Sequence, residues 1–103
     1  MVRTRFIVQV RYGHFAEYLK ALEQLNEIAR ERGWAEATFW VSTAGTANEL
    51  IAESDYPDLA TFEGDGTAQA SDAEWMKLIR STVDMIVQGT ARSELFQTAP
   101  QLA

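Results

Sequence analysis

The 103-residue sequence contains no cysteine and only one histidine, His14. The absence of cysteine excludes disulfide bonds, thiolate zinc sites, iron–sulfur clusters and cysteine nucleophiles. A single histidine also argues against a histidine-based metal site within one chain, because such sites draw on several imidazole ligands. We therefore expect neither a metal centre nor a bound cofactor.

Basic residues and long apolar runs are also scarce. Nine Lys and Arg against fifteen Asp and Glu give a net charge of −6, the wrong sign for a typical nucleic-acid-binding surface. No apolar run approaches the ~20 residues of a membrane-spanning helix, and the first residues alternate instead of forming a signal peptide. We expect a cytoplasmic protein that binds neither nucleic acid nor membranes.

The composition is that of an ordinary globular protein, with 47% hydrophobic and 23% charged residues. Domains typically contain ~100–150 residues, so the length matches a single domain. We expect residues 1–98 to form that domain and residues 99–103, which include Pro100, to form an irregular tail.

Hydrophobic periodicity predicts the first two elements. Residues 4–12 alternate between two kinds of side chain, which indicates a strand that Gly13 ends. Residues 14–32 carry apolar side chains at three- and four-residue steps, which indicates a helix. Gly33 suits the position just after this helix, where the left-handed conformation costs glycine nothing.

The middle of the chain predicts a hairpin followed by a short helix. Residues 37–43 and 48–56 read as two strands, and the short link between them contains glycine. Pro57 suits the first position of a helix, because its missing N–H is not needed there. We expect this helix to end near Glu63, where residues 64–66 (Gly-Asp-Gly) follow.

A second long helix and a last strand complete the pattern. Ser71 and Glu74 match a capping box, which predicts a helix that starts at Ser71 and runs to about Gln88. Residues 90–97 read as the final strand.

The order β-α-β-β-α-β predicts an α+β fold of the ferredoxin-like type. We expect a four-stranded antiparallel sheet in the order 4-1-3-2, with the helices on one face. In the first strand, even-numbered residues would face the helices and odd-numbered residues would lie on the bare face. The first set is Phe6, Val8, Val10 and Tyr12, and the second is Arg5, Ile7, Gln9 and Arg11.

Large apolar side chains are predicted on that bare face: Ile7, Ile51, Trp40 and Phe96. Removing one such side chain from water contributes ~1.5–3 kcal/mol, so a single copy that leaves all of them exposed would be marginal and prone to association. We therefore predict a homodimer with C2 symmetry, in which the two sheets face each other as a dimeric α+β barrel.

Two segments carry a resemblance to a known superfamily. Residues 49–63, with Tyr56-Pro57-Asp58-Leu59 at the strand-to-helix turn, and residues 72–78 resemble the dimeric α+β barrel proteins. Within that superfamily the chain is most similar to NIPSNAP proteins, next to antibiotic-biosynthesis-monooxygenase-like domains, over roughly residues 3–96. The resemblance implies a dimer with a small-molecule cavity, either between sheet and helices or within the barrel.

Members of this superfamily include cofactor-independent oxygenases, haem-degrading enzymes and decarboxylases or dehydratases, and the fold alone does not choose among them. Haem-binding members use a histidine on the second long helix. The sequence has none in residues 71–88, which argues against haem degradation.

Polar side chains with the parity of the bare face form the predicted ligand site. An arginine, an amide, carboxylates and an indole around one cavity would orient a polar or aromatic molecule. These residues are Arg5, Gln9, Trp40, Glu53, Arg92 and Glu94. The alternative is that the charged residues among them form cross-strand pairs that fix register and the dimer, which is the commoner role of such pairs.

His14 is the candidate general acid–base, because an unperturbed imidazole titrates near neutral pH. A capping or surface role is the alternative at a helix N-terminus. The sequence therefore supports a small-molecule-binding dimer, with a cofactor-independent oxygenase as one reading. The other reading is a non-catalytic ligand-binding or assembly dimer.

Overall fold

The computed structural model describes residues 1–100 as an α+β fold with one four-stranded sheet. The strands are β1 (Val2–Gln9), β2 (Ala37–Val41), β3 (Glu49–Tyr56) and β4 (Arg92–Gln97). The helices are α1 (Phe15–Arg32), α2 (Leu59–Ala70) and α3 (Ala73–Ser81), and a 3₁₀ turn, η1, spans Val83–Met85. The predicted tail, residues 99–103, lies partly outside the described residues, and the proposed domain limit at residue 98 stays a prediction.

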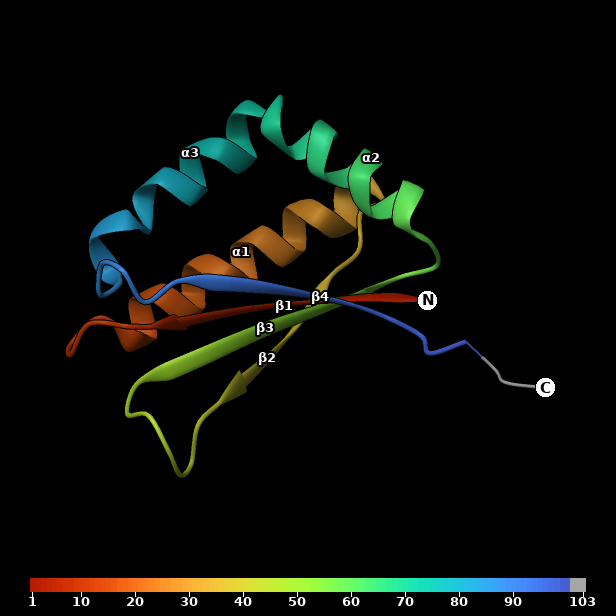
Figure 1. Ribbon diagram of the computed structural model, residues 1–103. Coiled ribbons are helices and arrows are strands. Elements are labelled where there is room, and N and C mark those ends of the chain that lie inside the picture. Colours follow the sequence, from red (N-terminus) through yellow and green to blue (C-terminus); the bar gives the residue numbers. More distant parts are fainter. Residues whose placement is uncertain (101–103) are drawn as a thin grey trace.

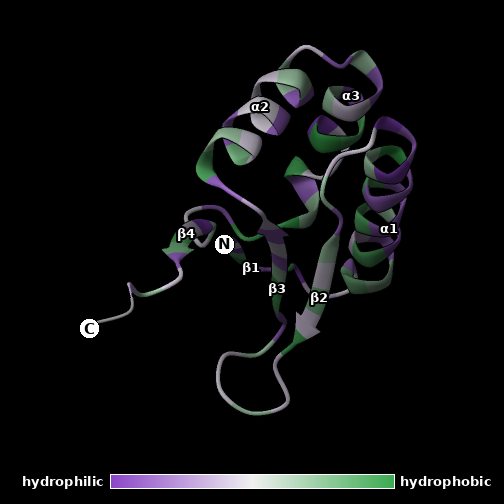
Figure 2. Ribbon diagram, turned by 90° about the vertical axis from the view of Figure 1, so that its right-hand side faces the viewer, coloured by the Kyte–Doolittle hydropathy of each residue, from purple (hydrophilic) through white to green (hydrophobic). Residues whose placement is uncertain are grey.

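The predicted sheet topology is confirmed. The strand order is β2-β3-β1-β4, and every pair of neighbouring strands is antiparallel. All three helices lie on one side of the sheet (Figure 1), and the loop between β2 and β3 extends away from them (Figure 2). Within residues 1–100, no helix combines the length and the apolar character required to cross a bilayer.

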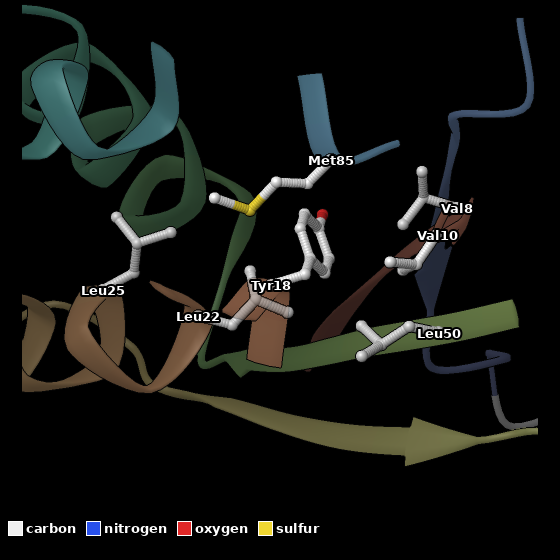
Figure 3. Close-up of a cluster of buried hydrophobic side chains, with 7 residues drawn as sticks. All are labelled: Val8, Val10, Tyr18, Leu22, Leu25, Leu50 and Met85. Carbon is white, nitrogen blue, oxygen red and sulfur yellow. The ribbon is translucent and has the colours of Figure 1, made fainter. Parts of the chain in front are cut away.

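The core lies between the sheet and α1. Val8, Val10 and Leu50 are almost completely buried, as the alternation of β1 and β3 requires. Figure 3 shows these three side chains beside the others of the cluster, which are Tyr18, Leu22, Leu25 and Met85. Helix α1 ends as predicted at Gly33, whose φ of 75° is left-handed and whose N–H bonds to the carbonyls of Ala29 and Arg30.

The prediction that Tyr12 faces the helices is wrong, because β1 ends at Gln9. Tyr12 lies in the turn that follows and is 80% exposed. The N–H of Arg11 bonds to the carbonyl of Met85. The chain therefore leaves the sheet before Tyr12 can reach the core.

The predicted start of the second long helix is shifted by one residue. Ser71 is the C-cap of α2, and Asp72 is the N-cap of α3, where its carboxylate accepts the N–H of Trp75 at 2.9 Å. That hydrogen bond, together with one from Arg32, lowers the pKa of Asp72 below its ordinary value. Aspartate and serine are about equally good N-caps, so the pattern alone did not separate them.

The same helix also ends earlier than predicted. Helix α3 stops at Ser81, and η1 follows in place of the expected helix to residue 88. The segment after η1 pairs with the end of β1, through a bridge between Val10 and Ile86 and a bond from the Val87 N–H to the Gln9 carbonyl. These sheet-type contacts take up the backbone groups that a longer helix would have used.

Helix α2 is longer than predicted and passes through Gly64 and Gly66 without a break. Neither glycine has a positive φ, and a Cβ on either would meet no atom within 4 Å. Gly64→Ala and Gly66→Ala should each raise the free energy of unfolding by about 0.5–1 kcal/mol, because glycine is the poorer helix former. Urea denaturation measures this change.

Gly33→Ala is the matched control for that prediction. Its φ of 75° is left-handed, so the same added methyl group should lower stability by about 1 kcal/mol. A loss of stability in all three variants would contradict a helical conformation at residues 64 and 66.

Candidate functional site

The sheet face opposite the helices is bare of any other element in the part of the chain that the structure describes (Figure 1). The register places Arg5 between Glu53 on β3 and Glu94 on β4. Two residues further along β1, Ile7 lies between Ile51 on β3 and Arg92 on β4. Trp40 on β2 is opposite Ile51. The predicted parity of this face is confirmed for the residues within the four strands, whereas Arg11, which was also expected on it, lies beyond the end of β1.

Arg5 is the centre of a charged cluster on the bare face. Its Nε bonds to Glu53 Oε2 at 2.8 Å, and one of its terminal nitrogens is 3.8 Å from Glu94 Oε1. The guanidinium carbon is also 5.0 Å from the centroid of the Phe96 ring, which is within the range of a cation–π contact. Two carboxylates therefore share one guanidinium, and an anionic ligand would have to compete with both of them.

A second cross-strand ion pair lies beside this cluster. Arg3 Nε and a terminal nitrogen donate to the two oxygens of Asp55 at 2.7 and 3.1 Å, a bidentate arrangement. The hydrogen bond from Arg3 holds the pKa of Asp55 below its ordinary value. Arg3 was not among the predicted site residues, although its odd number gives it the same face as Arg5.

The six predicted ligand residues are divided among separate cavities. Trp40 and Glu53 line one cavity of 320 Å3, and Gln9 and Arg92 line another of 320 Å3 near residues 89–91. Arg5 lines a third, of 310 Å3, against Phe96. The structure thus brings Arg5, Glu53 and Glu94 into contact, but it does not gather all six residues around one cavity. Their role in ligand binding stays a prediction.

The apolar residues expected on the bare face differ in exposure. Trp40 is 54% exposed and Phe96 is 42% exposed, in line with a face that lacks a cover. Ile7 is only 3% exposed, so the expectation that it is uncovered is wrong. It lies on a central strand, flanked by Ile51 and Arg92, and these neighbours shield it within a single chain.

Another cavity, of 250 Å3, lies between α2 and the β1–β4 edge of the sheet. We call it the α2 cavity. Its lining includes the aromatic rings of Phe6 and Phe62, the side chain of Leu95, and the hydroxyl-bearing residues Thr4 and Ser93. Phe62 is held in place by Tyr56, whose ring meets it edge-on at 5.3 Å. Sequence reasoning missed this site, because nothing local shows that Phe62 of α2 lies near residues of β1 and β4.

Two titratable lining residues of the α2 cavity point away from it. Arg5 and Glu94 line it, but their side chains meet on the bare face of the sheet. The cavity is therefore suited to hold an apolar or aromatic body, with hydroxyls at its polar positions.

His14 lies just before α1, outside these cavities. Its side chain makes no capping hydrogen bond, and its Nδ1 is 3.4 Å from Glu17 Oε2 at a half-exposed position. The structure therefore does not bring the candidate acid–base near the other predicted residues. Among residues 1–100, no group of three or more His, Asp or Glu side chains is arranged to hold a metal ion.

The helices on one face of a β2-β3-β1-β4 sheet define a ferredoxin-like α+β protein. The NIPSNAP family model matches residues 7–99, which is nearly the whole chain. The chain therefore belongs to the NIPSNAP family. No match was found among curated proteins.

Solved structures of low sequence identity share the fold. An uncharacterized NIPSNAP domain protein from Burkholderia xenovorans has a TM-score of 0.80 at 17% identity, covering 100% of this chain and 99% of that one. A NIPSNAP family protein from Agrobacterium tumefaciens has a TM-score of 0.77 at 19% identity, covering 95% and 92%. A structure described as an antibiotic biosynthesis monooxygenase has a TM-score of 0.75 at 12% identity, covering 97% and 100%.

Proposed function

We propose that the chain forms a homodimer through its bare sheet faces and binds a small aromatic molecule in the α2 cavity. The observation that carries the binding function is that cavity, which combines two phenylalanine rings with two hydroxyl side chains. Ligand sites are typically apolar concavities with a few placed polar groups, and this lining has that character.

The support for the homodimer is the exposed apolar surface beside charged pairs. Trp40 and Phe96 are large side chains in contact with water, and isolated soluble domains rarely keep such residues on one uncovered sheet face. A second copy brings the same face, so that a twofold arrangement buries these side chains on both partners. The cross-strand ion pairs would then lie within or beside the interface.

The second candidate function is a cofactor-independent oxygenase acting on the same aromatic molecule. Its support is the likeness of fold to the antibiotic biosynthesis monooxygenase, together with the aromatic lining of the α2 cavity. A general base has to lie within hydrogen-bond reach of the proton that it removes. The titratable residues among those lining the cavity, Arg5 and Glu94, point to the other face, which favours binding over catalysis.

The test is binding of 1,4-hydroquinone to the purified protein, followed by NMR of the aromatic side chains. We expect shifts at Phe6 and Phe62. Ser93→Phe should weaken binding at least about tenfold, because Ser93 is opposite Phe6 and the added ring would fill the cavity. Ser93→Ala is the matched control and should keep most of the affinity.

Three results separate the alternatives. Unchanged binding in Ser93→Phe would rule out the α2 cavity. Shifts confined to the Trp40 indole would place the ligand on the bare face, as the sequence predicted. Oxygen uptake above the uncatalysed autoxidation of the quinol, in buffer with a metal chelator, would favour the oxygenase. Its absence alongside binding would favour the non-catalytic dimer.

A further inference from the structure

A groove of 410 Å3 is lined by residues of α1 and α3. We call it the α1–α3 groove. Both helices lie in the helical layer, on the side of the sheet away from the bare face (Figures 1 and 2). The groove belongs neither to the α2 cavity nor to the proposed dimer surface. The residues that decide its chemistry are Glu27, Ile28 and Glu31 on α1 and Glu74, Lys77 and Leu78 on α3.

The groove is fixed at one end, where the C-terminus of α1 meets the N-terminus of α3. Arg32 Nε bonds to the N-cap carboxylate of Asp72 at 3.0 Å. Beside it, the rings of Trp34 and Trp75 meet edge-on at 5.4 Å. These contacts hold the two helices together, so the groove that runs from this end has stable walls.

The floor of the groove is apolar. Ile28 is buried, and Leu78 packs against the hydrophobic core cluster. A ligand lying on these two residues would contact hydrocarbon that the core already holds in place. The volume of the groove falls within the ~300–1,000 Å3 of typical small-molecule sites. An apolar ligand body therefore has a fitting surface.

The rim of the groove is acidic. Glu27, Glu31 and Glu74 provide three carboxylates against the single ammonium of Lys77. Arg32 contacts Glu31 at 3.3 Å and Glu74 at 3.6 Å, which partly neutralises that end. Glu27 lines the groove and has no ion pair with another residue among 1–100. The net charge of −6 adds a negative field around the whole chain.

We propose that the α1–α3 groove binds a small organic cation with an apolar body. The body lies on Ile28 and Leu78, and the ammonium or amidinium group lies beside Glu27. The negative rim repels an anion of the same shape, so charge gives the site its selectivity. Lys77 also lines the groove, and its positive charge opposes binding of the cation.

The test uses three probes with one apolar body and different charge. They are 4-phenylbutylammonium, 4-phenylbutanol and 4-phenylbutyrate, each titrated into isotopically labelled protein with the methyl groups of Ile28 and Leu78 as NMR reporters. We expect the cation to bind at least about fivefold more tightly than the anion, with the alcohol between them. Equal affinities, or shifts located away from these methyl groups, would overturn the proposal.

Substitutions of charged rim residues test where the cationic group of the ligand binds. Glu27→Gln should weaken the cation about two- to fivefold and leave the alcohol unchanged, while Lys77→Gln should strengthen the cation by a similar factor. Glu23→Gln is the matched control, because Glu23 is exposed on the same helix but does not line the groove. Equal weakening in Glu23→Gln and Glu27→Gln would show a general charge effect and overturn the site.

Discussion

Leu50→Ala is expected to lower the free energy of unfolding by about 3–4 kcal/mol. Leu50 is completely buried in β3 and belongs to the cluster between the sheet and α1 (Figure 3). Truncation of a fully buried leucine removes its transfer free energy and leaves a cavity that the neighbours fill only in part. A domain of this size has a total stability of about 5–15 kcal/mol, so this loss would leave the variant marginal.

Ile51→Ala is the matched comparison, because the next residue of the same strand lies on the opposite face. Ile51 is only half-buried in the single chain, so its truncation should cost less than that of Leu50 at low protein concentration. If the bare faces meet in a dimer, the cost for Ile51→Ala should rise with protein concentration, since unfolding then includes dissociation.

Urea denaturation at two protein concentrations measures both variants. An equal loss of stability for Leu50→Ala and Ile51→Ala at low concentration would contradict the assignment that the helices cover only the sheet face that carries Leu50. For Ile51→Ala, an effect that is independent of concentration would argue against its burial by a partner.

The sequence predicted the sheet and α1 because their patterns reflect a single physical constraint. In β1 and β3, every second residue faces the helices, so Val8, Val10 and Leu50 could be assigned to the core from parity alone. In α1, the apolar stripe and Gly33 both follow from helix geometry. A hydrophobic periodicity that extends over many residues predicts an element correctly even where single residues depart from the pattern.

The second half of the chain was harder to predict because competing contacts decide its elements. Glycine usually weakens a helix, but α2 continues through Gly64 and Gly66. Neither of them has the positive φ that a glycine-dependent turn requires. The end of α3 depends on the bridge between Val10 and Ile86, which joins residues far apart in the sequence. No local sequence pattern predicts such a contact.

In the candidate site, too, the features that follow from strand parity could be predicted, and those that depend on tertiary contacts could not. Parity predicted that Arg5, Glu53 and Glu94 share a face, and the register brings them into contact. Parity could not show that Ile7 is shielded within one chain, since its exposure depends on neighbouring strands. The α2 cavity depends on how Phe62 lies over β1 and β4, which is a tertiary arrangement.

Arg5→Glu is expected to weaken the proposed dimer at least about 100-fold. The change removes the ion pair with Glu53 and the contact with Glu94, and it places three carboxylates together on the bare face. Burying unpaired charge in an interface costs about 3 kcal/mol or more, which corresponds to roughly two orders of magnitude in the dissociation constant. Sedimentation velocity over a range of concentrations measures the change.

Arg11→Glu is the control, because it makes the same change in net charge. Arg11 is exposed beyond the end of β1, where it donates to the backbone carbonyl of Asp84 at 3.2 Å and not to the carboxylates of the sheet. Equal weakening by both variants would indicate long-range repulsion between acidic chains instead of a contact at Arg5. If the unaltered protein sediments at micromolar concentration as a folded 11.6 kDa particle, the bare face has no second copy to cover it, and the proposed dimer is wrong.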